Sequence, residues 1–107
     1  MTANIAPIRM GVNIGEIINE TIDIEGLLKG TELANGTPTV TESRGLTITN
    51  EAVNTTTQVV QGRDVLVGEG IDYTISGFSS GLYVVDITFD TDASATRVCR
   101  VEYQVCG

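Results

Sequence analysis

Residues 71–105 of the chain, IDYTISGFSSGLYVVDITFDTDASATRVCRVEYQV, decide its fold. Apolar side chains occupy every second position in the three segments 71–76, 82–90 and 97–105. Side chains along a β-strand point alternately to the two faces of its sheet, so each segment has one apolar face. The pattern predicts three consecutive strands with Tyr73, Tyr83 and Tyr103 on their inward faces.

The connections between these segments are short and rich in turn-forming residues. Glycines bracket residues 77–81, and residues 90–94 read Asp-Thr-Asp-Ala-Ser. A short connection suits strands that run side by side in opposite directions. We therefore expect antiparallel neighbours, with residues 77–81 forming a hairpin loop.

The rest of the chain contains further short apolar or threonine-rich segments separated by turns. We expect strands at 17–24, 39–41, 46–48 and 55–60, and a bend or single helical turn at 26–30, whereas residues 61–67 have no clear place. About seven short strands at intervals of roughly 8–12 residues, without a long amphipathic helix, predict an all-β antiparallel β-sandwich. A small β-barrel is the alternative.

The first 14 residues stand apart from this strand count. An apolar stretch there comprises Ile5, Pro7, Ile8, Met10 and Val12. It can be a further strand of the domain or an arm that docks on a neighbouring subunit. We therefore divide the chain into an extended N-terminal arm, residues 1–14, and a β-sandwich domain, residues 15–107.

The two cysteines, Cys99 and Cys106, do not predict a disulfide. They are seven residues apart, an odd spacing, so on one strand they point to opposite faces. We expect Cys99 to be a small buried hydrophobic residue and Cys106 to be an exposed thiol that could cross-link copies of the chain. The interface predicted from the sequence therefore comprises Ile5, Pro7, Ile8, Met10 and Cys106.

The sequence predicts no catalytic, metal-binding or cofactor-binding residues. Residues 77–81 spell G-x-S-x-G, the nucleophile elbow of α/β-hydrolases, but that motif needs a histidine beside the serine and the chain contains none. Residues 90–94 resemble the start of a calcium loop, yet Ala95 and Val101 stand where an EF-hand needs glycine and glutamate. We expect a protein that is not an enzyme.

Charge and hydrophobicity limit the partners that the chain can bind. Fourteen acidic and six basic residues give a net charge of −8, which repels nucleic-acid phosphates and anionic lipid headgroups. The sequence has neither a leader-like apolar run nor about 20 consecutive apolar residues. A soluble chain made in the cytoplasm is therefore expected.

Three asparagines, Asn19, Asn35 and Asn54, begin Asn-x-Thr triplets. Such triplets accept glycans only in secreted eukaryotic chains. Threonine is abundant in this sequence, so we attribute the triplets to chance.

Several stretches of the sequence occur in a characteristic order. An acidic strand, EIINETIDI (16–24), leads into the apolar bend GLL (26–28), and a Gly-Leu-Thr-Ile segment follows at 45–48. A glycine-bracketed turn, an aromatic-led strand, a polar turn with arginine and a valine-ended strand then occupy 76–105. This order resembles the small immunoglobulin-like virion proteins of tailed bacteriophages described as fibre–tail adaptors. Ile24 stands where tryptophan is common in that family, and residues 61–70 look inserted.

The resemblance implies an immunoglobulin-like sandwich that is a non-enzymatic structural part of a virion, synthesised in the host cytoplasm. It would connect tail or neck to fibres in several symmetric copies, so its expected partners are other virion proteins, with no nucleic acid, membrane or cofactor. One alternative is a capsid decoration or cement protein bound to the major capsid protein. Another is a carbohydrate-binding module, against which the predicted inward positions of the three tyrosines argue.

Overall fold

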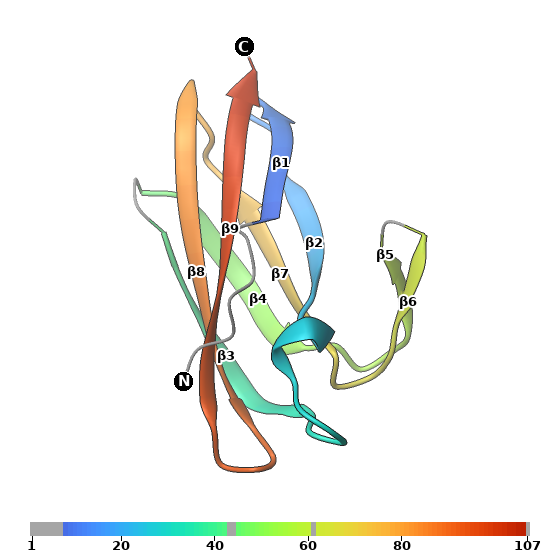
Figure 1. Cartoon of the computed structure of the whole chain (residues 1–107). Helices are drawn as coiled ribbons and strands as arrows, with labels where there is room; N and C mark the ends of the chain where they lie inside the picture. Colours follow the sequence, from blue (N-terminus) through green and yellow to red (C-terminus); the bar gives the residue numbers. More distant parts are fainter. Residues whose placement is uncertain (1–7, 43–44, 61, 107) are drawn as a thin grey trace.

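A computed structural model describes residues 8–42, 45–60 and 62–106 of the chain, and side chains from residue 11 to residue 105 within these ranges. The described backbone forms nine β-strands and one short 3₁₀ turn, η1 (Figure 1). In chain order the elements are β1 (Ile8–Asn13), β2 (Ile18–Asp23), η1 (Glu25–Leu27), β3 (Ala34–Glu42), β4 (Thr47–Val53), β5 (Gln58–Val60), β6 (Arg63–Val65), β7 (Gly70–Ser76), β8 (Gly81–Thr91) and β9 (Thr96–Cys106).

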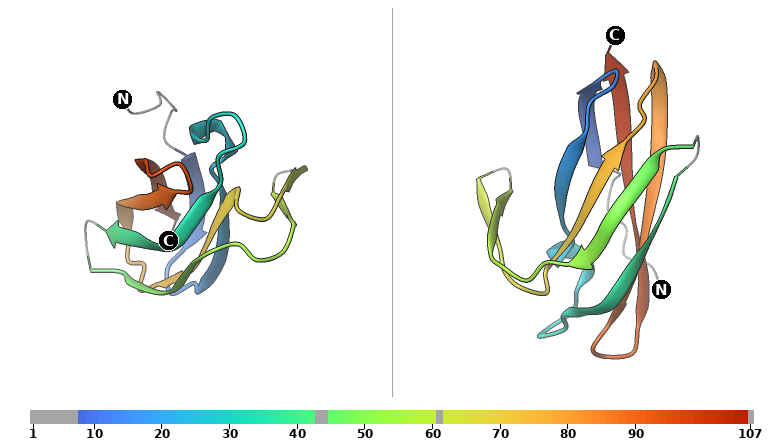
Figure 2. Two further views of the ribbon diagram at one scale, coloured as in Figure 1. Left: turned by 90° about the horizontal axis from the view of Figure 1, so that it is seen from below. Right: turned by 180° about the vertical axis from the view of Figure 1, so that it is seen from behind.

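Seven of these strands form two sheets that pack face to face, which confirms the predicted all-β sandwich (Figure 2). The larger sheet has the order β1-β9-β8-β3 and the smaller sheet the order β2-β7-β4. All neighbours are antiparallel except β1 and β9, which run parallel. Without β1, the sheet β9-β8-β3 corresponds to strands G, F and C of an immunoglobulin domain, and the sheet β2-β7-β4 corresponds to strands B, E and D.

The connection between β7 and β8 corrects one expectation from the sequence. Residues 77–81 are not a hairpin loop, because β7 pairs with β2 and β4 whereas β8 pairs with β9 and β3. The chain therefore crosses here from one sheet to the other. Phe78 is buried at this crossing and its ring packs edge-on against Tyr83, and the Ser79 N–H donates to the Tyr83 hydroxyl at 2.9 Å. This contact corresponds to the tyrosine corner of immunoglobulin-like sandwiches.

The other short connection agrees with the prediction. Strands β8 and β9 are antiparallel neighbours over ten residue pairs, from Gly81↔Val105 to Asp90↔Thr96. At the start of the chain, residues 8–13 of the predicted arm form β1, which pairs with β9 in the larger sheet. The Val12 side chain lies in the core at 5% exposure.

Aromatic side chains fill the centre of the sandwich. Tyr73, Tyr83 and Tyr103 are all at most 2% exposed, so their inward positions are confirmed. The hydroxyl groups of Tyr73 on β7 and Tyr103 on β9 lie 2.6 Å apart and form a hydrogen bond between the two sheets. Desolvation by burial raises the pKa of both hydroxyls. The Cys99 thiol is also buried, as predicted, and burial, with a smaller contribution from Asp86, raises its pKa to about 11.

We predict that the two tyrosine hydroxyls are coupled energetically. Tyr73→Phe or Tyr103→Phe alone leaves a buried hydroxyl without its partner and should lower the free energy of unfolding by about 1–2 kcal/mol. The double variant should cost less than the sum of the two single changes. Urea denaturation of the four proteins measures this coupling, and strictly additive costs would contradict it.

The β5–β6 hairpin lies outside both sheets and projects from one side of the sandwich (Figure 1). Its base is held by Asn54, whose side chain is 1% exposed. The Asn54 amide donates to the carbonyls of Thr56 (3.1 Å) and Leu66 (2.9 Å), and its carbonyl accepts from the N–H groups of Gly68 (2.9 Å) and Gly70 (3.0 Å). One side chain therefore joins both ends of the inserted hairpin to the sandwich.

We expect Asn54→Ala to destabilise the protein more than the same change at an exposed asparagine. The change leaves several buried backbone groups unpaired, which should cost about 2–4 kcal/mol in free energy of unfolding. Chemical denaturation measures the cost, with Asn35→Ala on the exposed part of β3 as the matched control. Equal stabilities of the two variants would contradict this role of Asn54.

Candidate functional site

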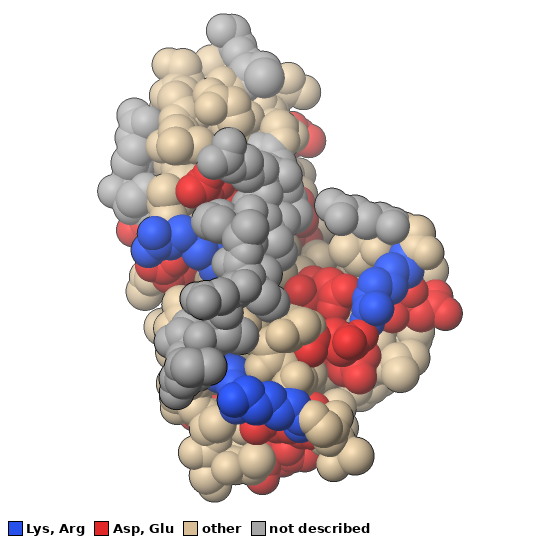
Figure 3. Space-filling view, viewed as in Figure 1, with Lys and Arg blue, Asp and Glu red and all other residues tan. Residues whose placement is uncertain are grey.

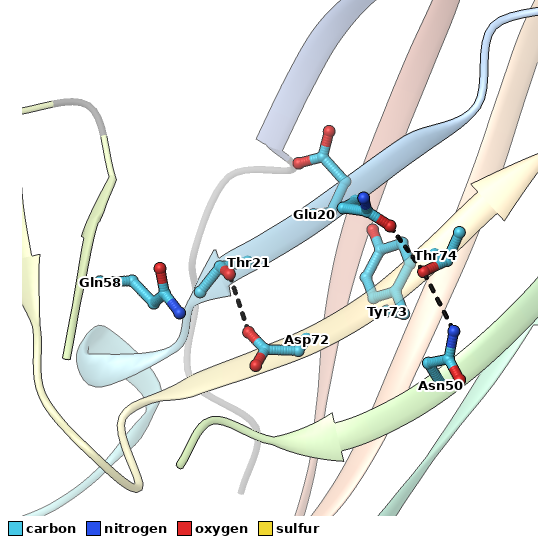
Figure 4. A pocket seen from close by; sticks show the side chains of 8 residues that line it. Glu20, Thr21, Asn50, Gln58, Asp72, Tyr73 and Thr74 are labelled. Atoms are coloured by element: carbon cyan, nitrogen blue, oxygen red, sulfur yellow. Dashed lines mark hydrogen bonds between the residues drawn. The ribbon is translucent and has the colours of Figure 1, made fainter. Parts of the chain in front are cut away.

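A polar groove lies on the outer face of the smaller sheet, beside the β5–β6 hairpin (Figure 4). Its volume is about 320 Å³, which is at the lower end of the range for small-molecule sites. Four strands, β2, β4, β5 and β7, contribute to it. The residues around the groove are Asn19, Glu20, Thr21, Asn50, Gln58, Asp72, Tyr73 and Thr74.

Strand alternation places the polar side chains of β2 and β7 on this face. Tyr73 points into the core, so its neighbours Asp72 and Thr74 point outward. On β2, Thr21 is directly opposite Asp72 and Asn19 is directly opposite Thr74. The Thr21 hydroxyl donates to Asp72 Oδ1 at 2.7 Å, and the Thr74 hydroxyl donates to Asn19 Oδ1 at 2.8 Å. These cross-strand hydrogen bonds fix four side chains of the groove.

A β-bulge in β4 brings Asn50 to the groove. The pairing of β4 with β7 shifts register between Thr49 and Ala52, and Asn50 within the bulge has a φ of 60°. Asparagine tolerates this left-handed conformation better than most residues, and bulges change the direction of a side chain. The Asn50 amide donates to the Thr74 hydroxyl at 3.4 Å, which extends the polar row onto a third strand.

The hairpin forms the wall at the far end of the groove. Figure 4 shows Gln58, on β5, beyond Thr21 and Asp72 on the side away from Asn50. The hairpin is fixed to the sandwich by Arg63, which pairs with Asp23 of β2 at 2.8 Å and with Glu25 of η1. These ion pairs hold the wall at the end of β2.

None of the described residues that line the groove is basic. Figure 3 shows acidic side chains gathered where the hairpin meets the sandwich. The three arginines whose side chains are described are each paired with a carboxylate. The pairs are Arg63 with Asp23 and Glu25, the buried pair Arg97 with Glu32, and Arg100 with Asp86. Because the chain has 14 acidic and six basic residues, most carboxylates have no such partner and the surface is negative.

Glu20 also borders the groove, but it lies on the inward-facing side of the edge strand β2. Its neighbours on that side of the strand are the half-buried Ile18 and the buried Ile22. Burial, with a smaller contribution from the charge of Glu16, raises the pKa of the Glu20 carboxyl group. The folded chain therefore stabilises the ionised form of Glu20 less than water does.

We predict that Glu20 makes stability depend on pH. Because its pKa is higher in the folded chain, the folded state binds more protons than the unfolded state, and stability falls as pH rises above 4.5, the ordinary value of a glutamate pKa. Glu20→Gln should thus raise the free energy of unfolding at pH 7, with the gain shrinking below pH 4.5. Thermal or urea denaturation across this range measures the difference. A gain that is constant with pH would contradict the prediction.

Ser79, and the described backbone of the interface predicted from the sequence, lie away from the polar groove. Ser79 of the G-x-S-x-G segment lies at the crossing between the sheets, where its N–H is bonded to Tyr83. Of the predicted interface, Ile5 and Pro7 lie outside the described residues. Ile8, Met10 and Cys106 lie on the paired strands β1 and β9, and their side chains are outside the described part of the chain.

Two features are absent from the described ranges. Within residues 8–42, 45–60 and 62–106, no three histidine, cysteine or acidic side chains are placed so that together they could hold a metal ion. No helix in the same part of the chain is long and apolar enough to cross a bilayer.

Comparisons with known proteins add little to this description. No protein-family model matches the chain, and no curated protein sequence matches it. The solution structure of amebosin is similar over 92% of this chain and 88% of that chain, with a TM-score of 0.46 and 12% sequence identity. A likeness at this level carries no argument about function.

Proposed function

We propose that the chain is a non-enzymatic structural module that binds other proteins, with the β5–β6 hairpin as its contact element. The observation that carries this proposal is the exposure of apolar side chains on that hairpin. Val59 on β5 is 72% exposed, and Leu66 and Val67, which follow β6, are 52% and 51% exposed. Solvated apolar groups on a projecting element are typical of interaction sites.

The hairpin is already held in one arrangement before any partner binds. Gln58 and Val65 are cross-strand partners on one face, and Val65 is fully buried against the sandwich. Val59 and Asp64 are partners on the opposite face, which points away from it. The contacts of Asn54 fix the base of the hairpin, and the ion pairs of Arg63 fix the strand end next to its turn. A partner that buries Val59 therefore has little ordering entropy to overcome.

Charge indicates the kind of protein that this surface would bind. Asp64 is the cross-strand partner of the exposed Val59, and the whole chain carries a net charge of −8. A partner with an apolar patch surrounded by lysine or arginine would be complementary to the hairpin. The same charge disfavours nucleic acid and anionic membranes as partners.

The biological setting that we propose is a phage virion. The resemblance to small immunoglobulin-like virion proteins supports a position between the tail or neck and the fibres, in several symmetric copies. The immunoglobulin-like strand order agrees with that resemblance. A capsid decoration protein bound to the major capsid protein is the alternative, and the location of the chain in the particle separates the two.

The hairpin variant Val59→Ser/Leu66→Ser tests the contact element. In particles of the phage that encodes the chain, we expect about tenfold fewer copies of this variant, because two buried apolar contacts would be lost. Quantitative mass spectrometry of purified particles gives the copy number, and cryo-electron microscopy gives the location.

The matched control is Leu82→Ser/Val98→Ser, which changes two exposed apolar side chains (48% and 42%) of the larger sheet. It should be incorporated like the natural protein. Equal incorporation of both double variants would contradict the role of the hairpin. A chain that is missing from purified particles would contradict the virion proposal.

A further inference from the structure

The polar groove retains hydrogen-bonding atoms that the described part of the chain does not use. Thr21 donates to Oδ1 of Asp72, so Oδ2 is available to a ligand. Thr74 donates to Oδ1 of Asn19, so the Asn19 amide N–H groups are available.

The Asn50 amide group donates to Thr49 and Thr74, so its carbonyl oxygen is available. The Gln58 amide donates to Thr56 at 3.0 Å, which leaves its carbonyl oxygen. The groove thus offers both donors and acceptors.

These atoms are held in position before any ligand binds. The cross-strand bonds of Asp72 and Asn19 restrict their rotamers, at 2.7 and 2.8 Å. Asn50 reaches the row only through a bulge in which its own backbone has a φ of 60°. A non-glycine residue in this region has a conformational cost, and such costs concentrate at ligand sites. The bulge therefore holds the Asn50 side chain at the groove before a ligand binds.

The chemistry of the lining selects the class of ligand. An anion is disfavoured by the Asp72 carboxylate and by the net charge of −8. A lysine or arginine side chain only donates, so it leaves the Asn19 amide without an acceptor. An apolar ligand would leave polar atoms unpaired, because the side chains that face the groove from β2, β4, β5 and β7 carry amides, hydroxyls and a carboxylate. A neutral group that both donates and accepts at several adjacent points fits best.

We propose that the polar groove binds a neutral carbohydrate, with adjacent sugar hydroxyl groups bridging Asp72, Asn50 and Asn19. Each hydroxyl donates to a carboxylate or carbonyl oxygen and accepts from an amide N–H. The volume of about 320 Å³ has room for one or two sugar units. This inference is independent of the proposed contact through Val59 and Leu66, because neither residue lines the groove.

Binding at a single groove should be weak. The ring of Tyr73 lies in the core at 1% exposure, so it provides no stacking surface for a sugar. The dissociation constant should be about 0.1–10 mM for one copy, because binding depends on a few hydrogen bonds that replace bonds to water. Several copies in one assembly would bind a polysaccharide much more tightly through avidity.

The test is an amide-shift titration by NMR of the ¹⁵N-labelled full chain with maltotriose, cellotriose and triacetylchitotriose, each to about 20 mM, with glycerol as a nonspecific polyol. At least one trisaccharide should give saturable shifts at residues 19–21 and 72–74. Asp72→Asn and Asn50→Gly should each weaken that binding about tenfold. Glycine accepts the positive φ at residue 50, so this variant removes the amide while keeping the bulge.

The matched control is Ser94→Gly, which replaces the other described non-glycine residue of positive φ (61°), in the turn between β8 and β9. It should bind as the natural protein does. The proposal is overturned if none of the three trisaccharides shifts these amides, or if glycerol produces the same shifts. It is also overturned if Asp72→Asn and Asn50→Gly bind with unchanged affinity.

Discussion

At the centre of the sandwich the hydroxyl groups of Tyr73 and Tyr103 lie 2.6 Å apart, and each is the other's hydrogen-bond partner in the buried core. A shift of either strand by one residue would turn its tyrosine to the surface and leave the other hydroxyl unpaired. This pair therefore fixes which face of β7 and which face of β9 point into the core. With Tyr73 inward, Asp72 and Thr74 must point outward, so the core contact also determines which atoms reach the polar groove.

Much of the sandwich can be predicted from residue alternation. The strands at 71–76, 82–90 and 97–105, the buried tyrosines and the buried Cys99 all follow from one apolar face per strand. The crossing at residues 77–81 could not be predicted, because short connections occur both in hairpins and between sheets. Phe78, which covers the end of the core there, was the available signal.

The groove was less predictable than the core. The outward positions of Asp72 and Thr74 follow from alternation, but Asn50 joins them only through a register shift between β4 and β7, which depends on long-range pairing. The Asn-x-Thr triplet that begins at Asn54 gives no sign of this residue's role, which is to form hydrogen bonds with four backbone groups from a buried position. Strand β6 could not be predicted from alternation, because Leu66 and Val67 beside it are apolar and yet exposed.

The parallel pairing of β1 with β9 has a mechanical consequence. Tension that enters the domain ahead of β1 and leaves it after β9 pulls these two strands in opposite directions along their own axes. The ladder from Ile8↔Val101 to Asn13↔Cys106 then carries the load in shear, so its hydrogen bonds are stretched together and not opened one after another. An antiparallel pair at the same place would unzip from one end under much smaller forces. A domain built in this way suits a link that must stay closed while the parts on either side of it are pulled apart.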